Sequence, residues 1–117
     1  MANSFGIPPE IEHRLRVRDR RCVYCGKRMK AHRHVRGTPY DKATIEHLNH
    51  RGPVYWEEGL WRGGLRVLAI CCGGCNASRN DKSLVAWFAT PYCEEGRISI
   101  RTVAPVVKRF LLRHPRG

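Results

Sequence analysis

The chain has 117 residues, and its 22 Lys and Arg against 10 Asp and Glu give a formal charge of +12. A hydrophobic content of 42% supports one modest core, so we expect a single domain over residues 1–117 and exclude a second folded domain. No apolar run approaches the ~20 residues of a membrane span, and no secretory signal starts the chain, so we expect a cytoplasmic protein without a membrane partner. The charge favours a polyanion as partner, the alternative being a basic surface kept only for solubility.

The N-terminal segment, residues 1–20, predicts a basic helix. Two prolines precede a stretch in which Ile11 and Leu15 lie four residues apart, the spacing of one helix face. Residues 1–36 hold ten Lys and Arg against three Asp and Glu, a charge of +7. We expect this region to contact phosphate groups through Arg18, Arg20 and Arg21.

Six cysteines in so short a chain indicate a metal site. Four of them form two Cys-x-x-Cys pairs, Cys22 with Cys25 and Cys72 with Cys75, and 46 residues separate the pairs. In a reducing compartment, thiolates two residues apart converge on one Zn²⁺ ion, whereas a single pair would equally suit a redox motif or chance. The pattern therefore predicts a structural four-cysteine zinc site. Cys71 and Cys93 are expected to fill the core.

The middle of the chain predicts short elements joined by long connections. Residues 27–40 lack any period and indicate a loop, and 43–45 indicate a short strand. The glycines and proline of 49–64 indicate a long connection. Residues 65–70 predict a strand that leads to the second cysteine pair, and a helix is expected to begin near Asn76.

Residues 83–117 predict a helical and extended C-terminal extension. Ser83 and Thr102 are placed to cap one helix each. The apolar faces of these helices, which we expect in the core, are Leu84, Trp87 and Phe88, and then Val103, Val106, Val107, Phe110 and Leu111. The alternating residues 97–101 predict a strand or an extended arm.

An acid next to an imidazole, Glu46-His47, lies between the two cysteine pairs, and Asn76 directly follows the second pair. In this order and spacing, residues 18–82 resemble the zinc-framed HNH endonucleases. The resemblance implies a small α+β fold, in which residues 21–82 form a ββα-metal core of two strands and a helix, with flanking helices.

The resemblance also implies a function, a metal-dependent endonuclease that hydrolyses phosphodiester bonds of double-stranded DNA. Glu46 and Asn76 would hold a Mg²⁺ or Mn²⁺ ion, and His47 would be the general base. Further, weaker candidates for the metal site are Asn80 and His50, while Arg79 and Lys82 would contact phosphates.

Two departures from the family pattern support a second hypothesis. The acid is Glu46 where Asp is commoner, and the central Asn of the family is missing from 65–70, with Asn49 as a candidate replacement. The alternative function is therefore a non-catalytic, zinc-stabilised nucleic-acid-binding module. A zinc deaminase is disfavoured, because it needs His-x-Glu and Pro-Cys-x-x-Cys.

Single side chains in this pattern also fit ordinary structural roles. Glu46 and His47 taken alone could be a surface pair, and Asn76 could merely cap its helix. His32 and His34 are expected to be loop residues. For the assembly, we expect that a homodimer is possible, with the helix over residues 103–111 as one candidate interface, and we expect a prokaryotic or phage context.

Overall fold

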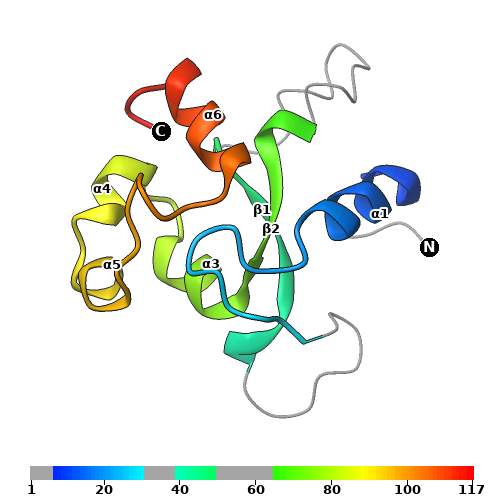
Figure 1. The fold of residues 1–117 in the computed structure, drawn as a ribbon, viewed down its shortest axis with the longest axis horizontal. Helices are drawn as coiled ribbons and strands as arrows, with labels where there is room; N and C mark the ends of the chain where they lie inside the picture. Colours follow the sequence, from blue (N-terminus) through cyan, green and yellow to red (C-terminus); the bar gives the residue numbers. More distant parts are fainter. Residues whose placement is uncertain (1–6, 31–38, 50–64) are drawn as a thin grey trace.

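A computed structural model describes residues 7–30, 39–49 and 65–117 of the chain (Figure 1). It is an α+β structure, as predicted, with a two-stranded antiparallel sheet and short helices. The elements in chain order are α1 (Pro9–Arg18), η1 (Pro39–Asp41), β1 (Ala43–His47), β2 (Leu68–Cys72), α3 (Gly73–Arg79), α4 (Leu84–Phe88), α5 (Pro91–Gly96) and α6 (Pro105–Arg113). Among these described elements, no helix has the length and apolar character needed to cross a membrane.

The sheet separates two apolar clusters. Ile45 of β1 lies opposite Ile70 of β2, and alternation along the strands sends Glu46 and Ala69 to the other face. In Figure 1, α1 lies on one side of the sheet and α3, α4 and α5 on the other. The smaller cluster joins α1 to the sheet and contains Ile7, Ile11, Leu15, Ile45, Leu68 and Ile70. The larger cluster, which contains Tyr24, Trp87 and Phe110, joins the first cysteine pair to the C-terminal helices.

Helix α1 confirms the predicted N-terminal helix, with Ile11 and Leu15 buried on its inner face. Its last residue and the next one attach it to β2. The Asp19 carboxylate accepts the backbone N–H of Ile70 at 3.0 Å and two hydrogen bonds from Arg18, each 2.8 Å long. Arg18 also donates to the backbone carbonyl of Leu68 at 2.8 Å. The guanidinium of Arg18 thus makes hydrogen bonds within the protein that attach the end of α1 to β2.

The elements around the second cysteine pair begin elsewhere than predicted. Strand β2 starts at Leu68 rather than at residue 65, and all five of its residues are buried. Helix α3 starts at Gly73 rather than near Asn76. The reason is that the Sγ atom of Cys72 caps this helix, accepting the backbone N–H of Cys75 at 3.4 Å. The turn of the cysteine pair is therefore itself the first turn of the helix.

The C-terminal extension confirms the predicted core and corrects the predicted starts. Ser83 caps α4, accepting the N–H of Ala86 at 3.2 Å. Helix α6 starts at Pro105 after Ala104, and Thr102 instead closes a turn, accepting the N–H of Ser99 at 2.9 Å. The eight apolar residues predicted for the core are buried, except Phe88, which is half-buried.

Residues 97–101 form turns, so the predicted strand or extended arm is wrong. Arg97 has a left-handed φ of 55° and ends α5, a helix that the sequence pattern did not predict. The loop expected over residues 27–40 and the connection expected over 49–64 lie mostly outside the described residues.

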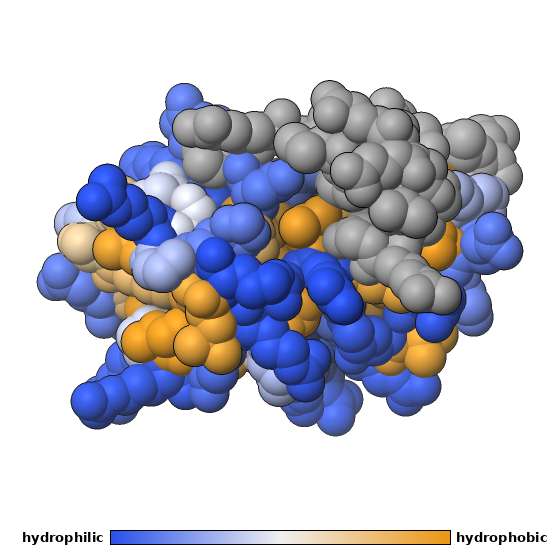
Figure 2. All heavy atoms as spheres, turned by 90° about the horizontal axis from the view of Figure 1, so that it is seen from above, coloured by the Kyte–Doolittle hydropathy of each residue, from blue (hydrophilic) through white to orange (hydrophobic). Residues whose placement is uncertain are grey.

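The surface is hydrophilic between separate apolar spots. Figure 2 shows one face, on which hydrophilic side chains surround several hydrophobic patches. The large hydrophobic side chains exposed in the described residues come from different elements, namely Val17, Tyr40, Val85, Tyr92, Ile100 and Leu112. Single exposed apolar residues of this kind are ordinary for a folded protein.

Candidate metal centre

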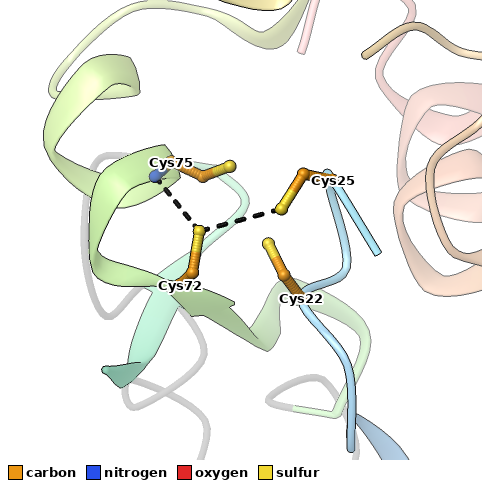
Figure 3. A group of neighbouring side chains, drawn as sticks. All are labelled: Cys22, Cys25, Cys72 and Cys75. Atoms are coloured by element: carbon orange, nitrogen blue, oxygen red, sulfur yellow. Dashed lines mark hydrogen bonds between the residues drawn. The ribbon is translucent and has the colours of Figure 1, made fainter. Parts of the chain in front are cut away.

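The four cysteines of the two Cys-x-x-Cys pairs meet in space (Figure 3). Their sulfur atoms all lie within 4.8 Å of one another, and Cys25 Sγ is 3.8 Å from Cys72 Sγ. A tetrahedral zinc ion with Zn–S bonds of about 2.3 Å requires sulfur atoms about 3.8 Å apart. The cluster therefore has the donor set and the spacing of a structural zinc site, and these four cysteines could hold the ion.

Backbone geometry holds each pair in place before any metal binds. The first pair turns tightly, because the N–H of Gly26 donates to the carbonyl of Cys22 at 2.9 Å, and Gly26 adopts a left-handed φ of 76° that suits glycine. The N–H of Val23 joins this turn to the carbonyl of Ile70 in β2 at 3.2 Å. The second pair spans the junction of β2 and α3. The sulfur cluster thus joins the turn that follows α1 to the end of the sheet.

Hydrogen bonds among the thiols prepare them to lose protons. Hydrogen bonding to Cys25 lowers the pKa of Cys22 to about 7, and hydrogen bonding to Cys22 lowers the pKa of Cys72 to about 7. The same cluster raises the pKa of Cys75, which keeps its proton in the metal-free protein. A metal ion replaces these protons, because thiolates are its ligands.

Helix α5 adds a side chain that the sequence pattern did not predict. The hydroxyl of Tyr92 donates to Cys75 Sγ at 3.4 Å, and its ring stacks on Trp87 with centroids 6.0 Å apart. No sequence signal pointed to Tyr92, since α5 itself was not predicted. Cys71 and Cys93 are fully buried and lie outside the sulfur cluster, which confirms their predicted place in the core.

Glu46 lies in a buried network on the α3 face of the sheet. Its side chain is almost fully buried, and its Oε2 atom accepts the Tyr24 hydroxyl at 2.8 Å and Arg79 Nη1 at 3.4 Å. Burial raises the pKa of Glu46, against the lowering effect of Arg79 and Tyr24. The interpretation of Glu46 as part of a surface pair is therefore wrong.

Arg79 is fully buried, with 0% of its surface exposed. Besides Glu46, its guanidinium donates to the backbone carbonyls of His47 at 3.0 Å and of Leu48 at 2.6 Å. Because the guanidinium has no exposed surface and is bonded within the fold, the structure does not support the interpretation of Arg79 as a phosphate contact. The side chain instead fixes the chain at the end of β1.

His47 is the last residue of β1 and is half-buried. Strand alternation turns it away from the face that carries Glu46, so these sequence neighbours do not face each other. Burial lowers the pKa of His47, which keeps the imidazole neutral near pH 7. A neutral imidazole is able to accept a proton.

Asn76 lies on α3 beside β1. Its Nδ2 atom donates to Thr44 Oγ1 at 2.9 Å and to the carbonyl of Ile45 at 3.4 Å. The interpretation that Asn76 only caps the helix is wrong, because Cys72 is the cap. These hydrogen bonds of Asn76 share no partner with those of Glu46 to Tyr24 and Arg79, and an ion held by both side chains stays a prediction.

The remaining predicted residues are spread over the surface. Arg20, Arg21, Asn80 and Lys82 are exposed, and Asn80 ends α3 with a φ of 52°. Their assignments as phosphate contacts or, for Asn80, as a weaker metal ligand stay predictions. His50, His32 and His34 lie outside the described residues.

Comparison of the chain with protein-family models, curated proteins and solved structures finds no match. What the site can do chemically follows from its own geometry. A closed set of four sulfur ligands suits a structural ion rather than a reactive one, because no open coordination position remains for water or substrate. In the sheet Cys72 pairs with Ala43 and Leu68 pairs with His47, so the sulfur cluster and His47 lie at opposite ends of the two strands.

Proposed function

We propose that the protein is a zinc-stabilised endonuclease of the HNH type, which hydrolyses phosphodiester bonds of DNA with His47 as general base. One observation supports this function above all. Asn76 of α3, directly after the second cysteine pair, bonds to Thr44 and Ile45 of β1, the strand that ends at His47. The order and spacing of the two cysteine pairs, the acid-His pair and Asn76 supply the remaining support.

The resemblance implies a divalent ion, Mg²⁺ or Mn²⁺, held by Asn76 and Glu46, and only Asn76 fits as a ligand in this structure. The Nδ2 atom of Asn76 is committed to Thr44, which leaves its Oδ1 oxygen as a ligand of the kind that such ions take. Glu46 does not fit as it stands, because the core holds its carboxylate with Tyr24 and Arg79. The proposal therefore depends on His47 and Asn76.

In the proposed reaction, the imidazole of His47 takes a proton from the water that attacks the phosphate, the ester bond from phosphorus to the 3′ oxygen breaks, and the departing oxygen takes a proton from solvent. A positioned general base contributes roughly 10²- to 10⁴-fold to such a reaction. Arg79 acts through the backbone, since its bonds to the carbonyls of His47 and Leu48 fix the position from which the imidazole projects.

The burial of Glu46 favours a second candidate function, a non-catalytic nucleic-acid-binding module. A carboxylate used in a core ion pair with Arg79 contributes to folding and is unavailable to an ion. Under this hypothesis the zinc site and the charge of +12 serve binding alone.

Plasmid relaxation with Mg²⁺ or Mn²⁺ separates the two functions. The variant His47→Ala tests the base, and His13→Ala is its matched control, because His13 is exposed on α1. For the endonuclease we expect His47→Ala to cut about 100-fold more slowly or worse, with His13→Ala and the zinc content unchanged. Wild-type protein that binds the plasmid yet leaves it supercoiled across metals and salts would establish the binding module instead.

A further inference from the structure

A pocket of about 220 Å³ lies between α1 and the sheet. Its charged lining residues are Arg16, Asp19, Arg20 and Lys30, and Ala43 and Ile70 form part of its apolar wall. The volume is below the ~300–1,000 Å³ usual for drug-sized ligands. The pocket therefore suits one compact ionic group better than a whole small molecule.

The acid in this pocket is already neutralised. Both carboxylate oxygens of Asp19 accept from Arg18 at 2.8 Å, and one also accepts the N–H of Ile70. The other acid near Lys30 is Asp41, and it pairs with Lys27 at 2.6 Å. Asp19 and Asp41 are therefore paired with cations other than those that line the pocket.

The cations keep an excess of positive charge. Arg16 pairs with Glu12 at 2.8 Å, whereas Arg20 and Lys30 are exposed and have no ion pair within the described residues. These two side chains come from segments that are distant in sequence, one following α1 and one following the first cysteine pair. Because both side chains line one small pocket, about two unpaired positive charges are available there to bind an anion.

The backbone around the pocket is held in place. Arg16 Nη1 donates to the carbonyl of Ala43 at 3.3 Å, which fixes its guanidinium over the wall of the pocket. The N–H of Lys30 donates to the carbonyl of Asp41 at 2.8 Å, and the N–H of Ala43 donates to the carbonyl of Lys30 at 3.0 Å. Arg16, whose guanidinium is already held, loses little freedom when an anion binds, whereas the exposed side chains of Arg20 and Lys30 become ordered on binding.

We propose that this pocket binds one phosphate group of a nucleic-acid backbone, with Arg20 and Lys30 as its principal partners and Arg16 as a fixed third donor. The inference rests on the proposed function only in taking nucleic acid as the partner, and it needs no cleavage. Arginine forks and lysine ammonium groups are the usual ligands of phosphate oxygens.

Charge reversal tests the pocket by fluorescence anisotropy of a labelled DNA duplex without added divalent ions, so that binding is measured apart from cutting. The pocket variants are Arg20→Glu and Lys30→Glu, and the matched controls are Lys108→Glu and Arg109→Glu, because these residues are exposed on α6. We expect each pocket variant to weaken binding about tenfold or more. Each control should weaken it less than about threefold.

The salt dependence gives a second measure of the same contacts. Each phosphate that is no longer neutralised reduces the slope of log K against log salt by ~0.9, so the double pocket variant, which loses one phosphate, should lose about 1 and the double control less than about 0.5. Pocket and control variants that keep their zinc and lose equal DNA affinity would overturn the proposal. Such a result would mean that DNA responds to the net charge of the protein and not to this pocket.

A free phosphate is the other source of the same chemistry, and calorimetric titration with inorganic phosphate distinguishes it. Weak or undetectable binding of inorganic phosphate, together with the pocket-specific loss of duplex binding, supports a backbone phosphate. Saturable binding of inorganic phosphate that Arg20→Glu abolishes, with duplex binding unchanged, would overturn it. A plasmid left uncut while the pocket variants still lose duplex binding would remove the endonuclease and leave this site standing.

Discussion

The guanidinium of Arg79 lies entirely inside the protein, where it meets a carboxylate, a hydroxyl and backbone carbonyls. Burying a charge of this kind is costly unless every partner is present. The partner charge comes from Glu46, a residue that the resemblance assigns to a metal. Substitution of Glu46 therefore tests folding before it tests catalysis.

We expect Glu46→Ala to lower the free energy of unfolding of the zinc-bound protein by about 3–5 kcal/mol, because it leaves Arg79 buried without a countercharge. The double variant Glu46→Gln/Arg79→Met removes both charges and should recover only the part of that loss due to the unpaired charge, because the carbonyls of His47 and Leu48 lose their donors. Urea unfolding at saturating zinc measures both values. A loss of under about 1 kcal/mol for Glu46→Ala would contradict the buried pair.

At the level of elements, α5 is a short helix of six residues whose placement brings a tyrosine to the metal centre. Tyr92 is 40% exposed, and partial burial together with the bond to Cys75 raises its pKa, so the hydroxyl stays protonated and is able to donate to the sulfur. A hydrogen bond from outside the ligand set orients a ligand and tunes its affinity for the metal.

We expect Tyr92→Phe to lower the affinity for zinc about tenfold or more while the helices persist. Tyr40→Phe is the matched control, because Tyr40 is exposed on η1 and also lies near Gly74. Competition with a chromogenic chelator measures the affinity, and circular dichroism checks the helices. Equal affinities of Tyr92→Phe and Tyr40→Phe for zinc would contradict the role that we assign to the hydroxyl of Tyr92.

Sequence patterns predicted those elements whose signals are local. The i, i+4 pair of α1 and the serine cap of α4 follow from the chain itself, and the two Cys-x-x-Cys pairs predicted the cluster of four sulfurs that could hold a metal ion. The alternation of residues 97–101 was misleading, because a strand also needs a partner, and these residues form turns.

The start of α3 and the state of Glu46 depend on tertiary contacts. A cysteine sulfur caps α3, and cysteine is not among the residues that usually cap a helix, so no local signal indicated this start. Glu46 is buried because Arg79, 33 residues later, turns inward to meet it. The sequence pattern drew attention to Glu46 and His47, but it could not predict the hydrogen-bond partners of Glu46, because these depend on tertiary packing.

At the scale of the whole molecule, a small hydrophobic core is joined to the sulfur cluster, and the charge of that cluster depends on pH. The thiols of Cys22 and Cys72 have pKa values of about 7, below the ordinary thiol value. A thiol with a lower pKa in the folded than in the unfolded chain stabilises the fold at higher pH, and this contribution is lost as pH falls through its folded value. The homodimer and the cytoplasmic location stay predictions.

The affinity of the protein for zinc should also fall as the pH falls. As the pH falls through about 7, protons compete for Cys22 and Cys72, so we expect zinc release to rise steeply between about pH 7 and pH 5. An indicator dye measures the released ion, and thermal unfolding at each pH should show a parallel loss of stability. Zinc affinity that is constant from about pH 8 to about pH 6 would contradict this linkage.

Binding of one ion by both cysteine pairs would also change the connectivity of the molecule. The 46 residues between Cys25 and Cys72 would then belong to a ring closed by metal–sulfur bonds. Ring closure restricts the unfolded chain, and its stabilising effect grows slowly with ring size. Cleavage of a single peptide bond within that ring would give two polypeptides that the ion still joins through its bonds to both cysteine pairs.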